Sequence, residues 1–244
     1  MFMTLRRVAV AAALSAVALG AFANATNDAF VDVTGSTAVD GFNNLVAGRI
    51  NAAGLAAGVA SNVAGSAHAA TLQRLTGGFY PASFGLYSFS TDSTFGINVA
   101  SAIADLGTVT LQTFVSVDTS QGVLGLLSAA YLPTLSFNGG AQQLAATYTS
   151  VTPVSGGFGM DGSPLEADPN NPNYGYFSWD LSGITTPITS FSVNFGLSVH
   201  SSALAFQLDQ SAVTAVPEPE SYALMLAGIA AVGLVVRRRQ RAAA

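Results

Sequence analysis

The clearest pattern in the chain is a strict alternation of apolar and polar or small residues from 191 to 200. The apolar residues stand at the odd positions, so five of them share one face of an extended strand. A second alternating run covers 204–208, after a Ser-Ser pair at 201–202. The two runs together predict a hairpin that ends the folded domain.

Similar alternation occurs at 95–99, 109–117 and 177–181. Residues that favour turns separate these runs, as at 138–140, 155–157 and 168–173. Several short strands with such spacing predict an all-β fold, an antiparallel β-sandwich of jelly-roll-like arrangement. A β-solenoid is the alternative, but it requires a repeat of fixed length, and we find none.

The stretch 40–75 differs from the rest because it is rich in Ala and Gly. Leu55, Val59 and Val63 are spaced four apart, which permits a close-packed helix. Five glycines between 41 and 65 each cost such a helix about 1 kcal/mol. Strands of small residues and a mobile loop therefore remain alternatives to a helix for this stretch.

Charge is scarce in this chain and unevenly placed. Charged residues make up 9% of it, and there is neither lysine nor cysteine. Between 26 and 216, eleven acidic residues face only Arg49 and Arg74, which gives a net charge of −9. Such a surface repels nucleic acid. The lack of cysteine excludes disulfides, thiolate metal sites and cysteine nucleophiles.

The N-terminal segment has the three parts of a secretory signal peptide. Arg6 and Arg7 precede an apolar run at 8–18, and the small residues Ala21, Ala23 and Ala25 follow it. Cleavage is expected after Ala23 or Ala25, so residues 1–25 form the predicted signal peptide with its helix. A retained membrane anchor is the alternative.

The C-terminal segment also combines three parts in a fixed order. Pro217, Glu218 and Pro219 form a stiff, extended strip, because proline blocks both helix and sheet pairing. An uncharged stretch at 222–236 follows, and as a helix it rises about 22 Å against a hydrocarbon core of about 30 Å. The basic residues at 237–241 are Arg237, Arg238, Arg239 and Arg241. The apolar stretch and these arginines together predict a transmembrane helix at 222–236 with its basic end in the cytoplasm.

This order resembles the PEP-CTERM sorting signal of Gram-negative bacteria, over about the last 26 residues. The resemblance implies that an exosortase recognises Pro217, Glu218 and Pro219 and processes the protein near them. It also implies a host that makes extracellular polysaccharide. The same tail is known as an ice-binding protein C-terminal domain, a name from which no activity follows here. Residues 26–215 are then the ectodomain, and 216–241 are the sorting and anchor segment.

Candidate catalytic groups are few. His68 and His200 are the only histidines, and neither lies near a Gly-x-Ser-x-Gly motif. Asp161, Glu166 and Asp168 form an oxygen-rich loop, a weak candidate for calcium whose spacing matches no calcium motif.

Tyr174, Tyr176 and Trp179 suggest a sugar-stacking platform, but in a strand the two tyrosines face opposite to Trp179. We expect Trp179 in the core.

The sequence therefore predicts a non-enzymatic surface or matrix protein without a cofactor, exported through the inner membrane and transiently anchored by its C-terminal helix. Its expected partners are signal peptidase, exosortase, membrane lipid and extracellular polysaccharide, and nucleic acid is excluded. A structural or adhesive role in an exopolysaccharide layer or biofilm is the leading hypothesis. A carbohydrate- or calcium-binding module is the alternative, and a secreted hydrolase is a third.

Overall fold

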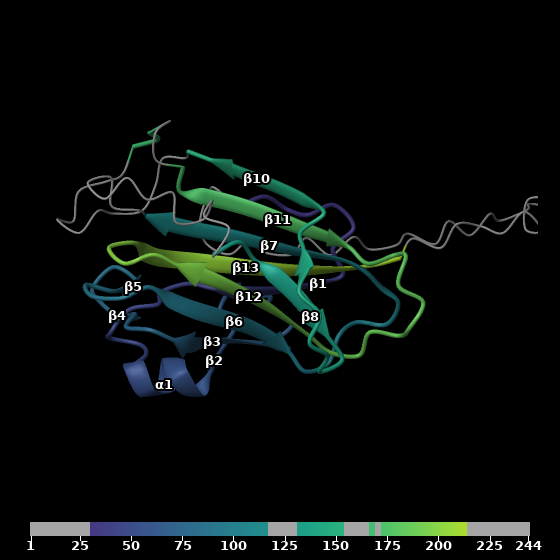
Figure 1. Ribbon diagram of the computed structural model, residues 1–244, viewed down its shortest axis with the longest axis horizontal. Helices are drawn as coiled ribbons and strands as arrows, with labels where there is room; N and C mark the ends of the chain where they lie inside the picture. The colour runs from purple at the N-terminus through teal and green to yellow at the C-terminus, as the bar shows by residue number, and fades with distance from the viewer. Residues whose placement is uncertain (1–29, 117–130, 154–165, 169–171, 214–244) are drawn as a thin grey trace, which may run out of the picture.

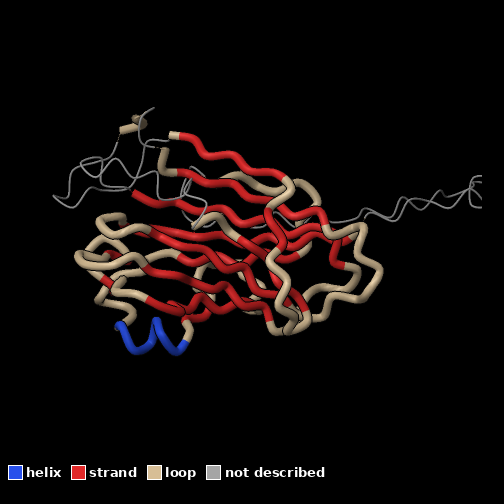
Figure 2. Tube along the Cα trace, in the orientation of Figure 1, coloured by secondary structure: helices blue, strands red, loops and turns tan. Residues whose placement is uncertain are grey.

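The computed structural model describes residues 30–116, 131–153, 166–168 and 172–213, and within them regular structure is almost entirely β-strand (Figures 1 and 2). The strands form two antiparallel sheets, which confirms the predicted all-β class. The expected signal helix and the expected transmembrane helix at 222–236 lie outside the described residues. No helix within the described ranges is long and apolar enough to cross a membrane.

The first sheet has seven strands among the described residues, in the order β10-β11-β7-β13-β5-β4, with β1 also paired to β13. Its members are β1 (Ala38–Phe42), β4 (Tyr80–Pro81), β5 (Leu86–Tyr87), β7 (Leu106–Ser116), β10 (Tyr148–Thr152), β11 (Tyr174–Asp180) and β13 (Ser202–Ala212). The long strands β7 and β13 pair over most of their length, from Ser116 opposite Ser202 to Leu106 opposite Ala212. They form the centre of this sheet.

The second sheet has six strands in the described part of the chain, in the order β2-β3-β6-β12-β8-β9. Its members are β2 (Val59–Ala60), β3 (Ala70–Thr76), β6 (Ser93–Val99), β8 (Thr134–Phe137), β9 (Leu144–Ala145) and β12 (Phe191–Leu197). The short helix α1 (Ala52–Ala57) contacts β3, and Figure 2 shows it at one edge of the structure. The longer strands of both sheets run roughly along the long axis (Figure 1).

The core lies between the inner faces of the two sheets. One cluster of buried side chains takes members from both, including Leu111, Trp179 and Phe206 from the first sheet and Ile97 and Val193 from the second. Each of these side chains is at most 1% exposed. The period-two pattern of the sequence therefore identified most of the core-facing residues correctly. Leu204 is the exception: it packs with the outer cluster, because β13 has a register shift between Ala203 and Ala205.

The predicted hairpin of 191–200 with 204–208 is wrong. β12 pairs with β6 and β8, whereas β13 pairs with β1, β5 and β7, so the two consecutive strands belong to different sheets. The rings of Phe195 and Phe206 meet across the core, with centroids 5.1 Å apart. Alternation identifies the buried face of a strand but does not identify its neighbour, and here the connection at 198–201 carries the chain from one sheet to the other.

Most of the 40–75 stretch is not helical. Within it, only Ala52–Ala57 forms a helix. The Asn51 side chain caps this helix by accepting a hydrogen bond of 2.7 Å from the Gly54 amide. Gly58 ends this helix with φ +111°, a conformation that side chains disfavour. Leu55 is fully buried and anchors the helix to the core, while the flanks of the stretch belong to β1 and β3.

Polar residues are buried on the outer face of the first sheet, under the segment 30–37. Gln112 joins this segment to β7, because its side chain accepts from the Val31 amide at 2.8 Å and donates to the Val31 carbonyl at 2.9 Å. Asp209 on β13 accepts hydrogen bonds from Ser36, Gln112 and Gln207. Asp209 is 1% exposed, and burial raises its pKa to about 6 despite these hydrogen bonds.

This raised pKa predicts a contribution of Asp209 to the pH dependence of stability, which Asp209→Asn should remove. The folded protein holds the proton more tightly than the unfolded chain, so ionisation of Asp209 destabilises the fold, fully so above about pH 6. Lowering the pH from about 7.5 to about 4.5 should raise the free energy of unfolding of the wild type by about 2 kcal/mol relative to the variant. Urea denaturation at both pH values measures this, and parallel pH profiles would contradict it.

The turn at 138–140 generates a second prediction. Gly139 has φ +67° and open space where a Cβ would lie, whereas Gly183 has equally open space and an ordinary φ. Gly139→Ala should therefore destabilise the fold by about 1 kcal/mol through backbone strain alone. Gly183→Ala is the matched control and should be neutral or slightly stabilising. Equal midpoints in thermal unfolding would contradict the assignment of strain.

Candidate functional site

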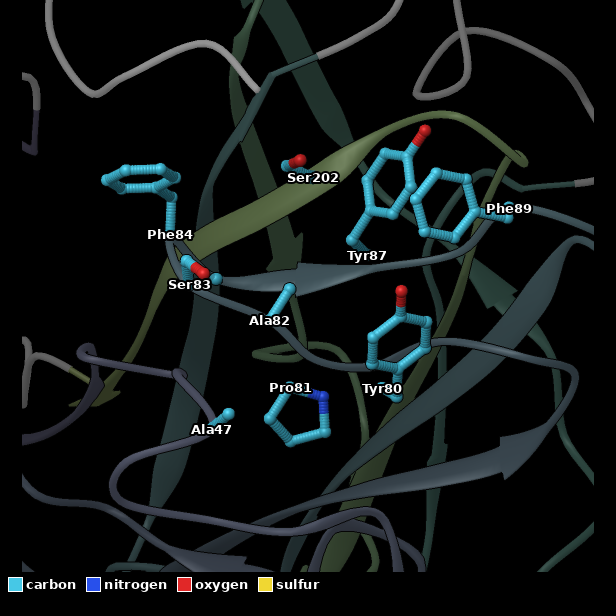
Figure 3. Close-up of a pocket in the computed structure, with 10 residues that line it drawn as sticks. Ala47, Tyr80, Pro81, Ala82, Ser83, Phe84, Tyr87, Phe89 and Ser202 are labelled. Carbon is cyan, nitrogen blue, oxygen red and sulfur yellow. The ribbon is translucent and has the colours of Figure 1, made fainter. Parts of the chain in front are cut away.

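A pocket of about 440 Å³ opens where the β4–β5 hairpin meets the start of β13. Its lining residues are small or aromatic, and none carries a carboxylate, an amine or an imidazole: Ala47, Tyr80, Pro81, Ala82, Ser83, Phe84, Gly85, Tyr87, Phe89 and Ser202. Figure 3 shows Tyr80, Tyr87 and Phe89 gathered on one side and Phe84 on the other, with Ala82 and Ser83 between them. The pocket is therefore an uncharged space with aromatic rings on two sides.

Three of these rings form a contiguous cluster. Tyr87 and Phe89 meet edge to face, with centroids 4.6 Å apart and planes at 78°. Tyr80 and Phe89 lie 6.4 Å apart and only 31° from parallel, so their faces point in similar directions. Phe89 is 58% exposed and Phe84 is 46% exposed, which is high for phenylalanine. Apolar ring surface is thus presented to solvent at the pocket.

The connection between β12 and β13 holds the base of this cluster in place. Tyr87 is 5% exposed, and its hydroxyl lies 3.0 Å from Nδ1 of His200 in the connection between β12 and β13. The His200 amide donates to the Ser88 carbonyl at 3.0 Å. His200 therefore supports the aromatic cluster from the connection between the two sheets.

The loop between β4 and β5 is held by backbone hydrogen bonds and by close packing. The Ala82 amide donates to the Gly85 carbonyl at 2.7 Å, and the Ala47 amide donates to the Ala82 carbonyl at 2.9 Å. A Cβ at Gly85 would lie 2.5 Å from the Ala203 carbonyl oxygen, so only glycine lets this loop pack against β13. Pro81 has no amide proton to donate, which suits its position in the last strand of the sheet order.

The aromatic residues singled out in the sequence do not form a shared platform. Trp179 is 1% exposed in the core, as expected, and its Nε1 donates to the Leu144 carbonyl at 2.9 Å. Tyr174 is buried on the outer face, where its hydroxyl donates to Gln112 at 2.8 Å and burial raises its pKa. Tyr176 contacts Tyr148 edge to face, with centroids 5.9 Å apart. The prediction that Trp179 and the two tyrosines lie on opposite faces of the strand is confirmed.

The acidic loop falls largely outside the described residues. Asp161 is not among them, whereas Glu166 and Asp168 are, with Glu166 exposed and Asp168 half-buried. Within the described ranges, no group of three His, Asp or Glu side chains could hold a metal ion. The calcium hypothesis therefore gains no geometric support from this part of the chain.

Asp40, Ser61 and His68 come together near β1, but in the wrong order for a hydrolase. Ser61 Oγ donates to Asp40 Oδ1 at 2.6 Å and lies 3.3 Å from His68 Nδ1, so the serine stands between the acid and the histidine. A catalytic triad needs the histidine between the other two, because it must take the hydroxyl proton while the acid orients it. Ser61 is also only 5% exposed. This cluster joins β1 to the loop between β2 and β3.

The aromatic pocket was missed in the sequence, although a signal for it was present. Five aromatic residues fall within 79–89, and glycines stand just before them at 77–78 and among them at 85. The segment lacks regular alternation, because β4 and β5 are only two residues long each. A search for period-two alternation therefore does not detect this segment.

The expected signal cleavage residues Ala21, Ala23 and Ala25, the strip Pro217–Pro219 and the basic cluster Arg237 to Arg241 all lie outside the described residues.

Comparison with protein families identifies a known motif in the C-terminal segment. A family model described as the PEP-CTERM protein-sorting motif matches residues 215–239. This range contains the Pro-Glu-Pro strip, the apolar stretch and the first three of the terminal arginines. The search of curated proteins and the search of solved structures found no match. The chain therefore carries a PEP-CTERM protein-sorting motif at residues 215–239, directly after the folded domain.

Proposed function

We propose that the chain is a non-enzymatic surface or extracellular-matrix protein that serves as a structural or adhesive component of an exopolysaccharide layer or biofilm. The observation that carries this proposal is the PEP-CTERM motif at 215–239, which indicates an exported protein sorted by an exosortase. β13 ends at Ala212, so the sandwich is formed before the motif begins. This arrangement suits a domain that is delivered outside the cell by its tail.

The charge of the ectodomain supports an extracellular role. Its eleven acidic residues against two arginines favour solubility and disfavour binding to nucleic acid. Without cysteine, the domain has no disulfide, and its stability comes from the two-sheet core and from hydrogen bonds such as those of Gln112. A fold of this kind does not depend on the redox state of its compartment.

The absence of enzymatic activity is part of the proposal. It is supported by the pocket at β4–β5, whose lining offers hydroxyl groups and rings but no acid or base. It is also supported by the order of Asp40, Ser61 and His68, in which the serine stands between the acid and the histidine, so the acid does not orient the histidine to accept the serine proton.

We interpret the strand order as jelly-roll-like. In the first sheet β1, β13, β7 and β11 are neighbours, and in the second β6, β12, β8 and β9 are neighbours. Successive strands thus cross repeatedly between the sheets, which is the interleaving that two Greek keys produce. The connections then gather at the two ends of the sandwich, and the aromatic pocket opens at the end where β4 and β5 lie (Figure 1).

Of the two binding alternatives, the structure favours carbohydrate over calcium. The exposed rings at Phe84 and Phe89 are suited to apolar faces of sugars, whereas the described acidic residues do not converge.

Replacing the two prolines of the sorting strip tests the delivery of the protein. In the Pro217→Ala/Pro219→Ala variant, exosortase should no longer recognise the tail, so the protein should keep its C-terminal segment and stay in the membrane fraction. The wild type should lose mass at its tail and appear at the cell surface or in the medium. Mass spectrometry of each fraction measures both outcomes.

Gly183→Ala is the control for this experiment, because it leaves the tail unchanged and lies in open space on the folded domain. It should be processed as the wild type is. If the double-proline variant shows the same mass and the same location as this control, sorting through the tail is refuted.

A further inference from the structure

We propose that the pocket at the β4–β5 hairpin is a binding site for neutral carbohydrate, with hexose units stacking on Phe89 and Tyr80. The inference rests on the proposed function in one respect: that function places the domain outside the cell, where it would meet the ligand. It goes beyond that function in naming the residues and the chemical class of the ligand.

The first argument is the surface that the rings present. A hexose has apolar C–H faces and a polar rim of hydroxyl groups, so it fits a site where aromatic faces alternate with hydrogen-bonding groups. The faces of Phe89 and Tyr80 point in similar directions, 31° from parallel, and Phe89 is 58% exposed. Hydroxyl groups of Ser83, Ser202 and Tyr80 lie among the same lining residues. A purely lipid-binding groove would not need this polar complement.

The second argument is charge. The lining residues carry no ionised side chain, and the ectodomain around them has a net charge of −9. A polysaccharide rich in uronic acid or phosphate would meet repulsion from the domain and no cation in the pocket to offset it. The site is therefore matched to neutral hexoses.

The third argument is that the site is already ordered. Tyr87 is 5% exposed, contacts Phe89 edge to face at 4.6 Å and meets His200 through its hydroxyl at 3.0 Å. The turn from Ala82 to Gly85 is closed by a hydrogen bond of 2.7 Å and packs against β13. A ligand entering such a site loses little affinity to the ordering of protein side chains.

Calorimetric titration of the full chain, in a detergent without a sugar headgroup, tests the proposal. The neutral probes are cellohexaose, laminarihexaose and mannohexaose, and the acidic probe is an alginate hexaose. We expect the wild type to bind at least one neutral probe and to bind the alginate hexaose at least about tenfold more weakly. No binding to any neutral probe would overturn the proposal while leaving the sorting of the protein, which is measured separately, unaffected.

Substitutions locate the site. Phe89→Ala and Tyr80→Ala should each weaken binding by about tenfold, because each removes one stacking ring. Tyr148→Ala is the matched control: Tyr148 is also 58% exposed and also contacts another tyrosine ring, but it lies on β10 outside the pocket. Its affinity should stay within about twofold of the wild type. Equal losses in all three variants would place the binding elsewhere.

Two further variants separate stacking from simple hydrophobic contact. Phe89→Tyr keeps an aromatic face and should retain affinity, whereas Phe89→Leu keeps apolar volume without a ring and should lose it. If Phe89→Leu binds the hexaose as well as the wild type, ring stacking is refuted. Binding of phosphatidylcholine vesicles that Phe89→Ala abolishes, without binding of any hexaose, would identify a lipid site instead.

Discussion

The contact between the two sheets is the constraint on which the rest of this structure depends. Phe195 on β12 and Phe206 on β13 meet across the core, and the side chains around them are almost fully removed from water. With no disulfide to limit the unfolded chain, burial of these apolar faces must supply most of the folding free energy. The connection at 198–201 places consecutive strands on opposite sides of this core. It also positions His200 beside Tyr87.

The outer face of the first sheet is organised by a different interaction. Gln112 and Asp209 are buried there, and the segment 30–37 covers them by hydrogen bonding through Val31 and Ser36. Buried polar groups stabilise a fold only when their partners are in place, so this segment is held in one position over β7 and β13. The buried carboxyl of Asp209 couples that position to pH, because its ionised form is disfavoured there.

The aromatic pocket and the sorting motif belong to different parts of the chain. The motif at 215–239 follows the last strand and directs delivery, whereas the pocket lies on the folded sandwich. An uncharged, ring-lined pocket on an acidic domain is a feature that delivery alone does not require. It is consistent with a domain that contacts neutral polymer once it is outside.

The sequence by itself determined the all-β class, the buried faces of the long strands, the core position of Trp179 and the sorting tail. These properties are local: alternation reports burial on one face, and the order of Pro-Glu-Pro, apolar stretch and arginines is read along the chain. Only the tertiary structure decided that β12 and β13 lie in different sheets, that α1 is limited to Ala52–Ala57, and that Tyr80, Tyr87 and Phe89 share a pocket. Which strands pair, and which rings meet, depends on long-range packing of the whole core, and a period-two pattern contains no information about partners.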